Sequence, residues 1–270
     1  MVVHSATFEL SPVIPPSERR AAVRGLILWL GGGSFCVFML LLVAAISADS
    51  SRADTFRFVG FVQFKLSGLG QITGATGSLS TTTSEKEIQM RLSNVSVGGA
   101  DKTQELVTRV DRSNLVLRSS IIYDVVKGVA IRTMQRKTDK SMLDNKETDI
   151  FEYTELKDGR ATRTEPYVEY KVADFLSVML IAADAIHRKE TRPIDLSMLR
   201  DRSVTRVTLT IGGEETVGGR PGTMVRVAPP DNPTGGIGYV IGRTNDGSYF
   251  PARISVATDR GLVELEGQPQ

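Results

Sequence analysis

Hydrophobic and polar residues alternate with a period of two along most of the chain after Asp54. In residues 55–66 one face of such a pattern collects the apolar side chains Phe56, Phe58, Val62, Phe64 and Leu66. Residues 85–92 repeat the pattern, with Ile88, Met90 and Leu92 alternating with charged or amide side chains. Successive side chains of a β-strand point to opposite faces, so both segments are predicted to be strands with one face on a core.

Shorter β-rich runs follow the first two at regular spacing. They cover residues 105–110, 114–118, 121–126, 130–135, 150–156, 204–211, 223–228, 238–242, 251–257 and 261–266. The separators are turn formers: Asp-Gly pairs at 158–159 and 246–247, and Gly-Gly pairs at 98–99, 212–213, 218–219 and 235–236. These residues accept the positive φ angles of tight hairpins, and parallel strands would need much longer connections. An antiparallel meander is therefore predicted.

One segment has the length and pattern of a helix. Residues 175–188 (FLSVMLIAADAIHR) are apolar in their first half, and Asp174 is placed to cap their N-terminus. A shorter helical turn is predicted at residues 195–200, and the polar residues 137–145 are predicted to form a long loop or hairpin tip. The predicted fold class is mainly β: a curved antiparallel sheet or half-barrel with one main helix packed on or inside its concave face.

The N-terminus contains a different kind of apolar segment. Residues 25–47 are uncharged, and at about 1.5 Å per residue a helix of this length spans about 34 Å, enough to cross a membrane. Arg19, Arg20 and Arg24 precede it, so the positive-inside rule places residues 1–24 in the cytoplasm. The predicted organisation is a cytoplasmic leader (1–24), a transmembrane helix or uncleaved signal anchor (25–47) and a periplasmic β-rich domain (54–270) of a bacterial inner-membrane protein.

Cleavage of the apolar segment is an open alternative. The segments 45–47 and 51–53 both present small residues at the spacing that a signal peptidase reads, and cleavage would release a soluble periplasmic protein. The leader length and the full spanning length favour retention.

Composition removes several function classes. The chain has 33 Lys+Arg and 31 Asp+Glu, a net charge of +2, so no bulk positive charge is available for nucleic acid. A single Cys and two His exclude a disulfide framework and a three-His metal site within one chain.

The candidate chemical motifs all have simpler structural explanations. Residues 68–74 are glycine-rich, but their spacing does not match a dinucleotide fingerprint and no Walker Lys follows. His187 and Asp184 lie three residues apart on the predicted helix, yet no nucleophile motif accompanies them, which favours a solvated helix end. No catalytic residue, cofactor or metal ligand is predicted, and the chain is predicted not to be an enzyme.

A curved sheet with an apolar face toward one helix either packs solidly or encloses a ligand cavity, and the pattern cannot separate the two. If a groove exists, its candidate lining is apolar: Phe58, Val62, Phe64, Phe175, Met179 and Ile186.

The C-terminal half carries a set of motifs that resembles a known family. These are Gly159 and Pro166, ADFLS at residues 173–177, GGR at 218–220, GSYFPARI at 247–254 and GLV at 261–263. The chain resembles a family of exported bacterial proteins known only as a domain of unknown function, with Phe175 where members often have Pro. The family looks related to the half-barrel carriers and receptors of periplasmic lipoproteins, which implies a ligand-holding fold without catalytic residues.

The sequence thus supports three functional hypotheses. The first is a non-enzymatic, membrane-tethered periplasmic protein that binds an apolar or amphipathic envelope component, such as a lipid or lipoprotein-like ligand. The second is a structural or assembly factor of the cell envelope that acts through protein contacts at a sheet edge. The third is an uncharacterised hydrolase.

Overall fold

The computed structural model describes residues 57–67, 76–93, 104–143, 146–157, 160–166, 168, 170–200, 203–233, 236–258 and 261–270. The chain divides into two compact units, Met1–Ser51 and Arg52–Gln270, and all described residues belong to the second. The predicted leader and membrane segment lie outside the described residues. Among the residues that the structure describes, no helix is long and apolar enough to cross a membrane.

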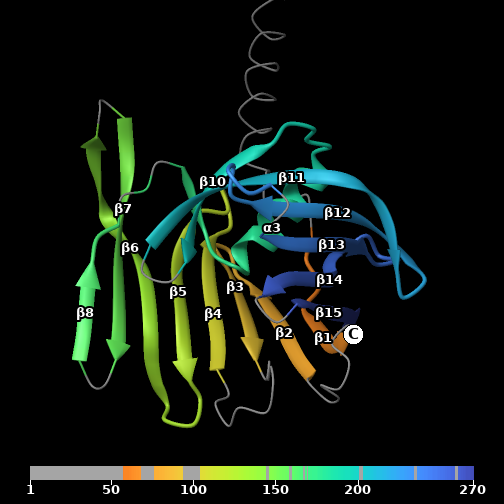
Figure 1. Cartoon of the computed structure of the whole chain (residues 1–270), viewed down its shortest axis with the longest axis horizontal. Coiled ribbons are helices and arrows are strands. Elements are labelled where there is room, and N and C mark those ends of the chain that lie inside the picture. Colours follow the sequence, from red (N-terminus) through yellow and green to blue (C-terminus); the bar gives the residue numbers. More distant parts are fainter. Residues whose placement is uncertain are drawn as a thin grey trace, which may run out of the picture. The chain divides into compact units, whose positions relative to one another are not determined.

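The second unit is mainly β, with one large curved sheet and one described helix (Figure 1). In chain order the strands are β1 (Phe61–Ser67), β2 (Thr76–Thr83), β3 (Glu87–Ser93), β4 (Gln104–Asp111), β5 (Leu117–Asp124), β6 (Val129–Leu143), β7 (Lys146–Lys157), β8 (Arg160–Thr164), β9 (Lys171–Ala173), β10 (Ile194–Arg200), β11 (Ser203–Val217), β12 (Arg220–Ala228), β13 (Ile237–Arg243), β14 (Tyr249–Thr258) and β15 (Gly261–Pro269). The helix α3 (Ser177–His187) lies between β9 and β10 in the chain.

The strand order confirms the predicted meander with one exception. Strands β1 to β8 follow one another in the sheet, as do β10 to β15, and β1 pairs with β15 to join the two runs. The exception is β9, which pairs with β10 in parallel. A parallel pair needs a long crossover connection, and α3 with its flanking turns supplies it.

The curvature of the sheet follows from the contacts of α3. The helix packs against β4 and also against β11, β13 and β14, although β4 and β11 are far apart in the strand order. A flat sheet could not bring both strands to one helix, so the sheet bends around α3 (Figure 1). Nearly all of the helix is buried, which confirms that its apolar half lies inside the fold: Ser177, Val178, Met179, Leu180, Ile181, Ala182, Ala183 and Ala185.

In the strands that alternate most clearly, the buried side chains are those that the sequence pattern predicted. In β3 the side chains of Ile88, Met90 and Leu92 are buried while their neighbours are not. The strand predicted at residues 55–66 is displaced, because β1 begins only at Phe61, after a bend at Gly60. Phe58 contributes an isolated parallel bridge to Tyr249 instead.

Several local predictions were wrong. Residues 195–200 are not a helical turn but part of β10, which pairs with β11 along its whole length. The pair Gly212 and Gly213 is not a hairpin turn but lies inside β11, at a shift of register. The two segments predicted at 114–118 and 121–126 form one strand, β5, that starts at Leu117. Residues 137–143 are not a long loop but continue β6 to the end of its hairpin with β7, where Leu143 pairs with Lys146, in line with the predicted alternative of a hairpin tip. The predictions also missed β2, β8 and β9.

Candidate ligand-binding cavity

A cavity of about 1230 Å³ opens at one end of the curved sheet. Alternate turns of an antiparallel meander lie at the same end of the sheet. The cavity lies where several such segments meet: the residues before β1, the turns β4–β5, β11–β12 and β13–β14, and the residues at the end of β15. The volume exceeds the 300 to 1,000 Å³ or so that is usual for small-ligand pockets. The cavity can therefore hold a ligand larger than a typical metabolite.

Four arginines from four separate segments line this cavity. They are Arg57, Arg112, Arg220 and Arg243, and the lining contains one acidic side chain, Asp246. Guanidinium groups present several N–H donors in a planar fork, which suits the oxygens of phosphate and carboxylate groups. The side chains of the lining thus carry more positive than negative charge.

Main-chain hydrogen bonds fix the first of these arginines to the sheet. The N–H of Tyr249 donates to the carbonyl of Arg57 at 2.7 Å, and the N–H of Val59 donates to the carbonyl of Tyr249 at 2.9 Å. These bonds and the bridge at Phe58 attach the segment that enters the domain to the start of β14. The guanidinium of Arg57 remains exposed.

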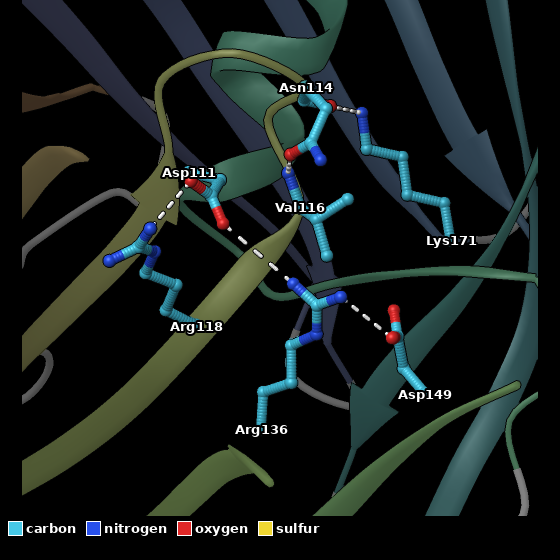
Figure 2. Close-up of polar contacts among 7 residues, drawn as sticks. All are labelled: Asp111, Asn114, Val116, Arg118, Arg136, Asp149 and Lys171. Atoms are coloured by element: carbon cyan, nitrogen blue, oxygen red, sulfur yellow. Dashed lines mark hydrogen bonds and ion pairs between the residues drawn. The ribbon is translucent and has the colours of Figure 1, made fainter. Parts of the chain in front are cut away.

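The second arginine, Arg112, stands on the turn between β4 and β5, which a polar network holds (Figure 2). Asp111 accepts a bond from Arg118 at 2.7 Å and lies 3.7 Å from Arg136, which itself pairs with Asp149 at 2.7 Å. The backbone N–H of Val116 donates to the side chain of Asn114 at 3.0 Å, and the carbonyl of Asn114 accepts a bond from Lys171 at 2.5 Å. The turn that carries Arg112 is thereby tied to both β6 and β9.

Carbonyl oxygens orient two of the guanidinium groups. Arg112 donates to the carbonyl of Ser84 at 3.3 Å, and Arg243 donates to the carbonyl of Gly247 at 3.1 Å. Arg243 also lies over the ring of Tyr249, 5.5 Å from its centroid, within the range of a cation–π contact. A carbonyl acceptor holds a guanidinium group in place without cancelling its charge.

Asp246 belongs to the tight turn between β13 and β14, where Gly247 has the positive φ of 86° that the Asp-Gly pair predicted. Its carboxylate accepts bonds from the hydroxyls of Thr244 and Ser248, the second at 3.0 Å. The bond from Thr244, followed by those from Ser248, lowers the pKa of Asp246 below its ordinary value. These bonds hold the one acidic side chain of the lining to its own turn.

The lining also contains apolar side chains. Phe58, Val59, Ile88 and Pro221 contribute to the lining, and the first two also pack against the main hydrophobic core. The lining therefore offers a ligand both apolar contacts and guanidinium groups.

Comparison of the chain with protein-family models, curated proteins and solved structures found no match. The family resemblance drawn from residues 159–263 stays a prediction, and the case for a function is carried by the geometry of the cavity.

The structure brings all six predicted groove residues into one hydrophobic cluster. Val62, Phe64 and Met179 are fully buried within it. Phe58, Phe175 and Ile186 are partly buried and pack against it, and Phe58 also lines the cavity. Of the six, Phe58 is thus the residue that joins the packed core to the open site.

The buried start of the α3 segment is a polar anchor and not part of the cavity lining. The carboxylate of Asp174 accepts bonds from the hydroxyls of Thr108 and Ser120, the latter at 2.6 Å, and from the N–H of Ser177 at 2.8 Å. Asp174 was predicted to cap the helix, but the helix begins at Ser177 with Leu176 at its N-cap, and Asp174 instead accepts the N–H of Ser177 from two residues further upstream. The hydroxyl of Tyr239 donates to the carbonyl of Phe175 at 3.1 Å, and burial, followed by the charge of Asp174, raises the pKa of Tyr239.

The predicted pair His187 and Asp184 lies at the other end of the helix. Asp184 accepts a bond from Arg188 at 2.5 Å, and the ring of His187 stands edge-on to Tyr249 with centroids 6.1 Å apart. In the part of the chain that the structure describes, no cluster of three or more His, Cys, Asp or Glu side chains is placed to hold a metal ion.

Sequence reasoning missed the four arginines of the cavity. Each comes from a different segment of the chain, separated from the next by many residues, so no motif or local charge run marks them. The one local signal is positional: Arg220 follows Gly219, Arg112 precedes the Ser113-Asn114 pair, and Arg243 precedes the turn at residues 244–247.

Proposed function

We propose that this protein is a non-enzymatic, membrane-tethered periplasmic protein that binds an amphipathic envelope component, a lipid or lipoprotein-like ligand, in the cavity at the open end of its curved sheet. Residues 25–47 anchor it as a single inner-membrane pass, or are removed as a signal to leave a soluble periplasmic form. The observation that carries the proposal is the lining of the cavity. It combines the apolar side chains of Phe58, Val59 and Ile88 with four arginines.

Two further features support this proposal. The volume of about 1230 Å³ suits a ligand with a hydrocarbon portion rather than a small metabolite. The curved sheet that holds one helix on its concave face also agrees with the half-barrel that the family resemblance implies.

Copurification tests the proposal. The full chain is extracted from bacterial membranes in a neutral detergent, and bound small molecules and proteins are identified by mass spectrometry, with the intact mass reporting whether residues 25–47 are retained. Phe58→Asp and Pro221→Asp place a charge among the apolar side chains of the cavity lining, and Pro221 is exposed, so its replacement leaves the core untouched. Val126→Asp is the matched control, because Val126 is 73% exposed and lies outside the cavity lining.

We expect a lipid or acylated species at about one equivalent on the native chain and on Val126→Asp, and its loss from both cavity variants. Equal retention by all four proteins, or no enrichment over an unrelated membrane protein, contradicts the proposal.

A structural or assembly role is the second candidate, and one observation favours it. Strand β8 ends the sheet, and all five of its residues, Arg160–Thr164, are exposed. An uncovered edge strand can accept a strand from another protein. A stoichiometric envelope protein in the same copurification, with no bound amphiphile, supports this role instead.

A further inference from the structure

The side-chain charges of the cavity are unbalanced. Its lining brings four guanidinium groups to one end of the sheet with a single acidic side chain, Asp246. Elsewhere in the described residues, arginines commonly face acids: Arg118 pairs with Asp111, Arg136 with Asp149, Arg188 with Asp184, Arg206 with Asp195 and Arg253 with Glu215. Two of the cavity arginines, Arg57 and Arg220, depart from this pattern, and their guanidinium groups can receive an anion from outside the chain.

Arg57 and Arg220 show the imbalance most directly. Both side chains are exposed, both line the cavity, and neither forms an ion pair or hydrogen bond within the described part of the chain. An arginine side chain that is not held by a partner keeps its rotamer freedom and its full set of donors. These two groups are therefore available to a ligand without the loss of any contact within the fold.

Arg112 and Arg243 are held more firmly. Their bonds to the carbonyls of Ser84 and Gly247 fix the direction of each guanidinium group, while the cation–π contact with Tyr249 adds a second restraint on Arg243. Preorganised donors lower the entropic cost of binding an anion. The cavity thus contains two oriented cations and two mobile ones.

Asp246 offsets one of these four positive charges, and its carboxylate is held to its own turn. Its carboxylate oxygens accept bonds from Thr244 and Ser248 of its own turn. An ionised carboxylate has few acceptor positions left once such bonds are formed.

We infer that the cavity recognises the phosphate group of its ligand through Arg57, Arg112, Arg220 and Arg243, with Phe58, Val59 and Ile88 receiving the apolar part. The inference rests on the proposed function, because it takes the same cavity as the binding site. It deepens that function by assigning a chemical class, a phosphate ester, to the ligand. Arginine clusters bind phosphate by paired N–H donors, and a phosphate carries enough oxygens to engage more than one guanidinium group.

The same chemistry is present in an anionic phospholipid headgroup and in free phosphate, so three probes separate the sources. The full chain in neutral detergent is titrated by calorimetry with dihexanoyl phosphatidylglycerol, dihexanoyl phosphatidylcholine and inorganic phosphate. The first carries a net negative phosphodiester and short acyl chains, the second has the same chains without net charge, and the third is the anion alone.

The test variant is Arg57→Gln with Arg220→Gln, which removes two charges from exposed side chains. Arg160→Gln with Arg163→Gln on β8 is the matched control, because it removes the same charge from exposed residues outside the cavity. The double variant Arg57→Lys with Arg220→Lys keeps the charge and loses the planar fork. Thermal melting of each variant verifies that the fold is retained.

The inference expects phosphatidylglycerol to bind more tightly than phosphatidylcholine, and binding to weaken with added salt. Arg57→Gln with Arg220→Gln should weaken phosphatidylglycerol binding about tenfold or more, the loss expected for one or two charge-assisted bonds, while the β8 control stays near the native affinity. The affinity of the lysine variant for phosphatidylglycerol should lie between those of the glutamine variant and the β8 control. Phosphate that binds as tightly as phosphatidylglycerol also supports the anion site, but it contradicts an amphipathic ligand.

Two results overturn the inference. Equal affinity for phosphatidylglycerol and phosphatidylcholine, unchanged in the glutamine variant, shows that the cavity binds amphiphiles without reading phosphate, and the proposed function then stands alone. No binding of any probe overturns both proposals.

Discussion

Asp174 is the polar group that connects the α3 segment to the sheet, and its replacement by alanine is the most informative test of the fold. The residue is 4% exposed and follows β9 directly. Its carboxylate accepts bonds from Thr108 on β4, Ser120 on β5 and the N–H of Ser177, and its own N–H donates to the hydroxyl of Ser177 at 2.8 Å. Alanine removes the acceptor and leaves three donors facing each other in the interior.

The expected loss can be worked from these bonds. A hydrogen bond to a charged group contributes about 1.5 to 3 kcal/mol, and a buried donor without an acceptor costs about 1 to 3 kcal/mol. Thr108 and Ser120 carry hydroxyls that can rotate toward other acceptors, whereas the N–H of Ser177 is fixed by the start of the helix. Burying the carboxylate also has a cost that alanine removes. We therefore expect Asp174→Ala to lower the free energy of unfolding by about 3 to 5 kcal/mol.

The assay is urea unfolding of the full chain in neutral detergent, followed by the circular dichroism signal of the β-sheet. A matched cycle uses Thr108→Val with Ser120→Ala, alone and combined with Asp174→Ala. The combined variant removes the two hydroxyl donors together with their acceptor. Its loss of unfolding free energy should therefore be about 2 kcal/mol smaller than the summed losses of Asp174→Ala and of Thr108→Val with Ser120→Ala. A loss below about 1 kcal/mol for Asp174→Ala, or strict additivity in the cycle, refutes the assignment of Asp174 as an anchor.

Three further predictions test other parts of the structure. Burial, opposed by the charge of Asp184, lowers the pKa of Lys171 from 10.5 to about 8, so between these values the unfolded chain holds a proton that the folded chain has lost. The free energy of unfolding should therefore rise across this pH range by up to about 1.4 kcal/mol per pH unit, and Lys171→Met should abolish that part of the rise in urea titrations. Leu115 is buried at a φ of 54°, a left-handed backbone conformation that is strained for any residue with a Cβ. Leu115→Gly relieves that strain, so it should be at least as stable as Leu115→Ala in thermal melts. A clearly less stable glycine variant would contradict the strain at this position. A Cβ on Gly267 would lie 2.1 Å from the carbonyl oxygen of Pro251, so Gly267→Ala should lower the free energy of unfolding by about 2 kcal/mol or more. Gly213 has open space around it, so Gly213→Ala should change the free energy of unfolding by less than about 1 kcal/mol. Similar losses for both variants would refute the close packing at Gly267.

The elements that sequence reasoning predicted well are those whose pattern is decided locally. Strand β3 alternates strictly, so its buried face could be assigned from the sequence. The turn at Gly218 and Gly219 adopts the positive φ angles, 56° and 78°, that two adjacent glycines allow. The helix was recognisable because its apolar run is too long and too continuous for a half-buried strand.

The elements that were missed depend on partners elsewhere in the chain. Strand β2 (TGSLSTTT) has few apolar residues, and it is a strand because β1 and β3 pair with it on both sides. Strand β10 follows Pro193, which suggested a helical turn, but β11 pairs with it residue by residue. Local sequence does not contain such pairings, which the register of the whole sheet decides.

The candidate site was the least predictable part for the same reason. Phe58 was predicted as a groove residue from its place in an alternating pattern, and it does line the cavity. The arginines beside it come from separate segments that meet only when the meander has folded around α3, so their spacing in the sequence carries no signal.

Site-specific photocrosslinking in living bacterial cells tests the central claim most directly. A photoreactive phenylalanine analogue replaces Phe58 in the lining of the cavity, and in a control chain it replaces Val126, which is exposed outside that lining. The account predicts an adduct with the mass of a lipid or acylated ligand at position 58 and none at position 126. An adduct with a protein alone at position 58, or no adduct that distinguishes the two positions, contradicts it.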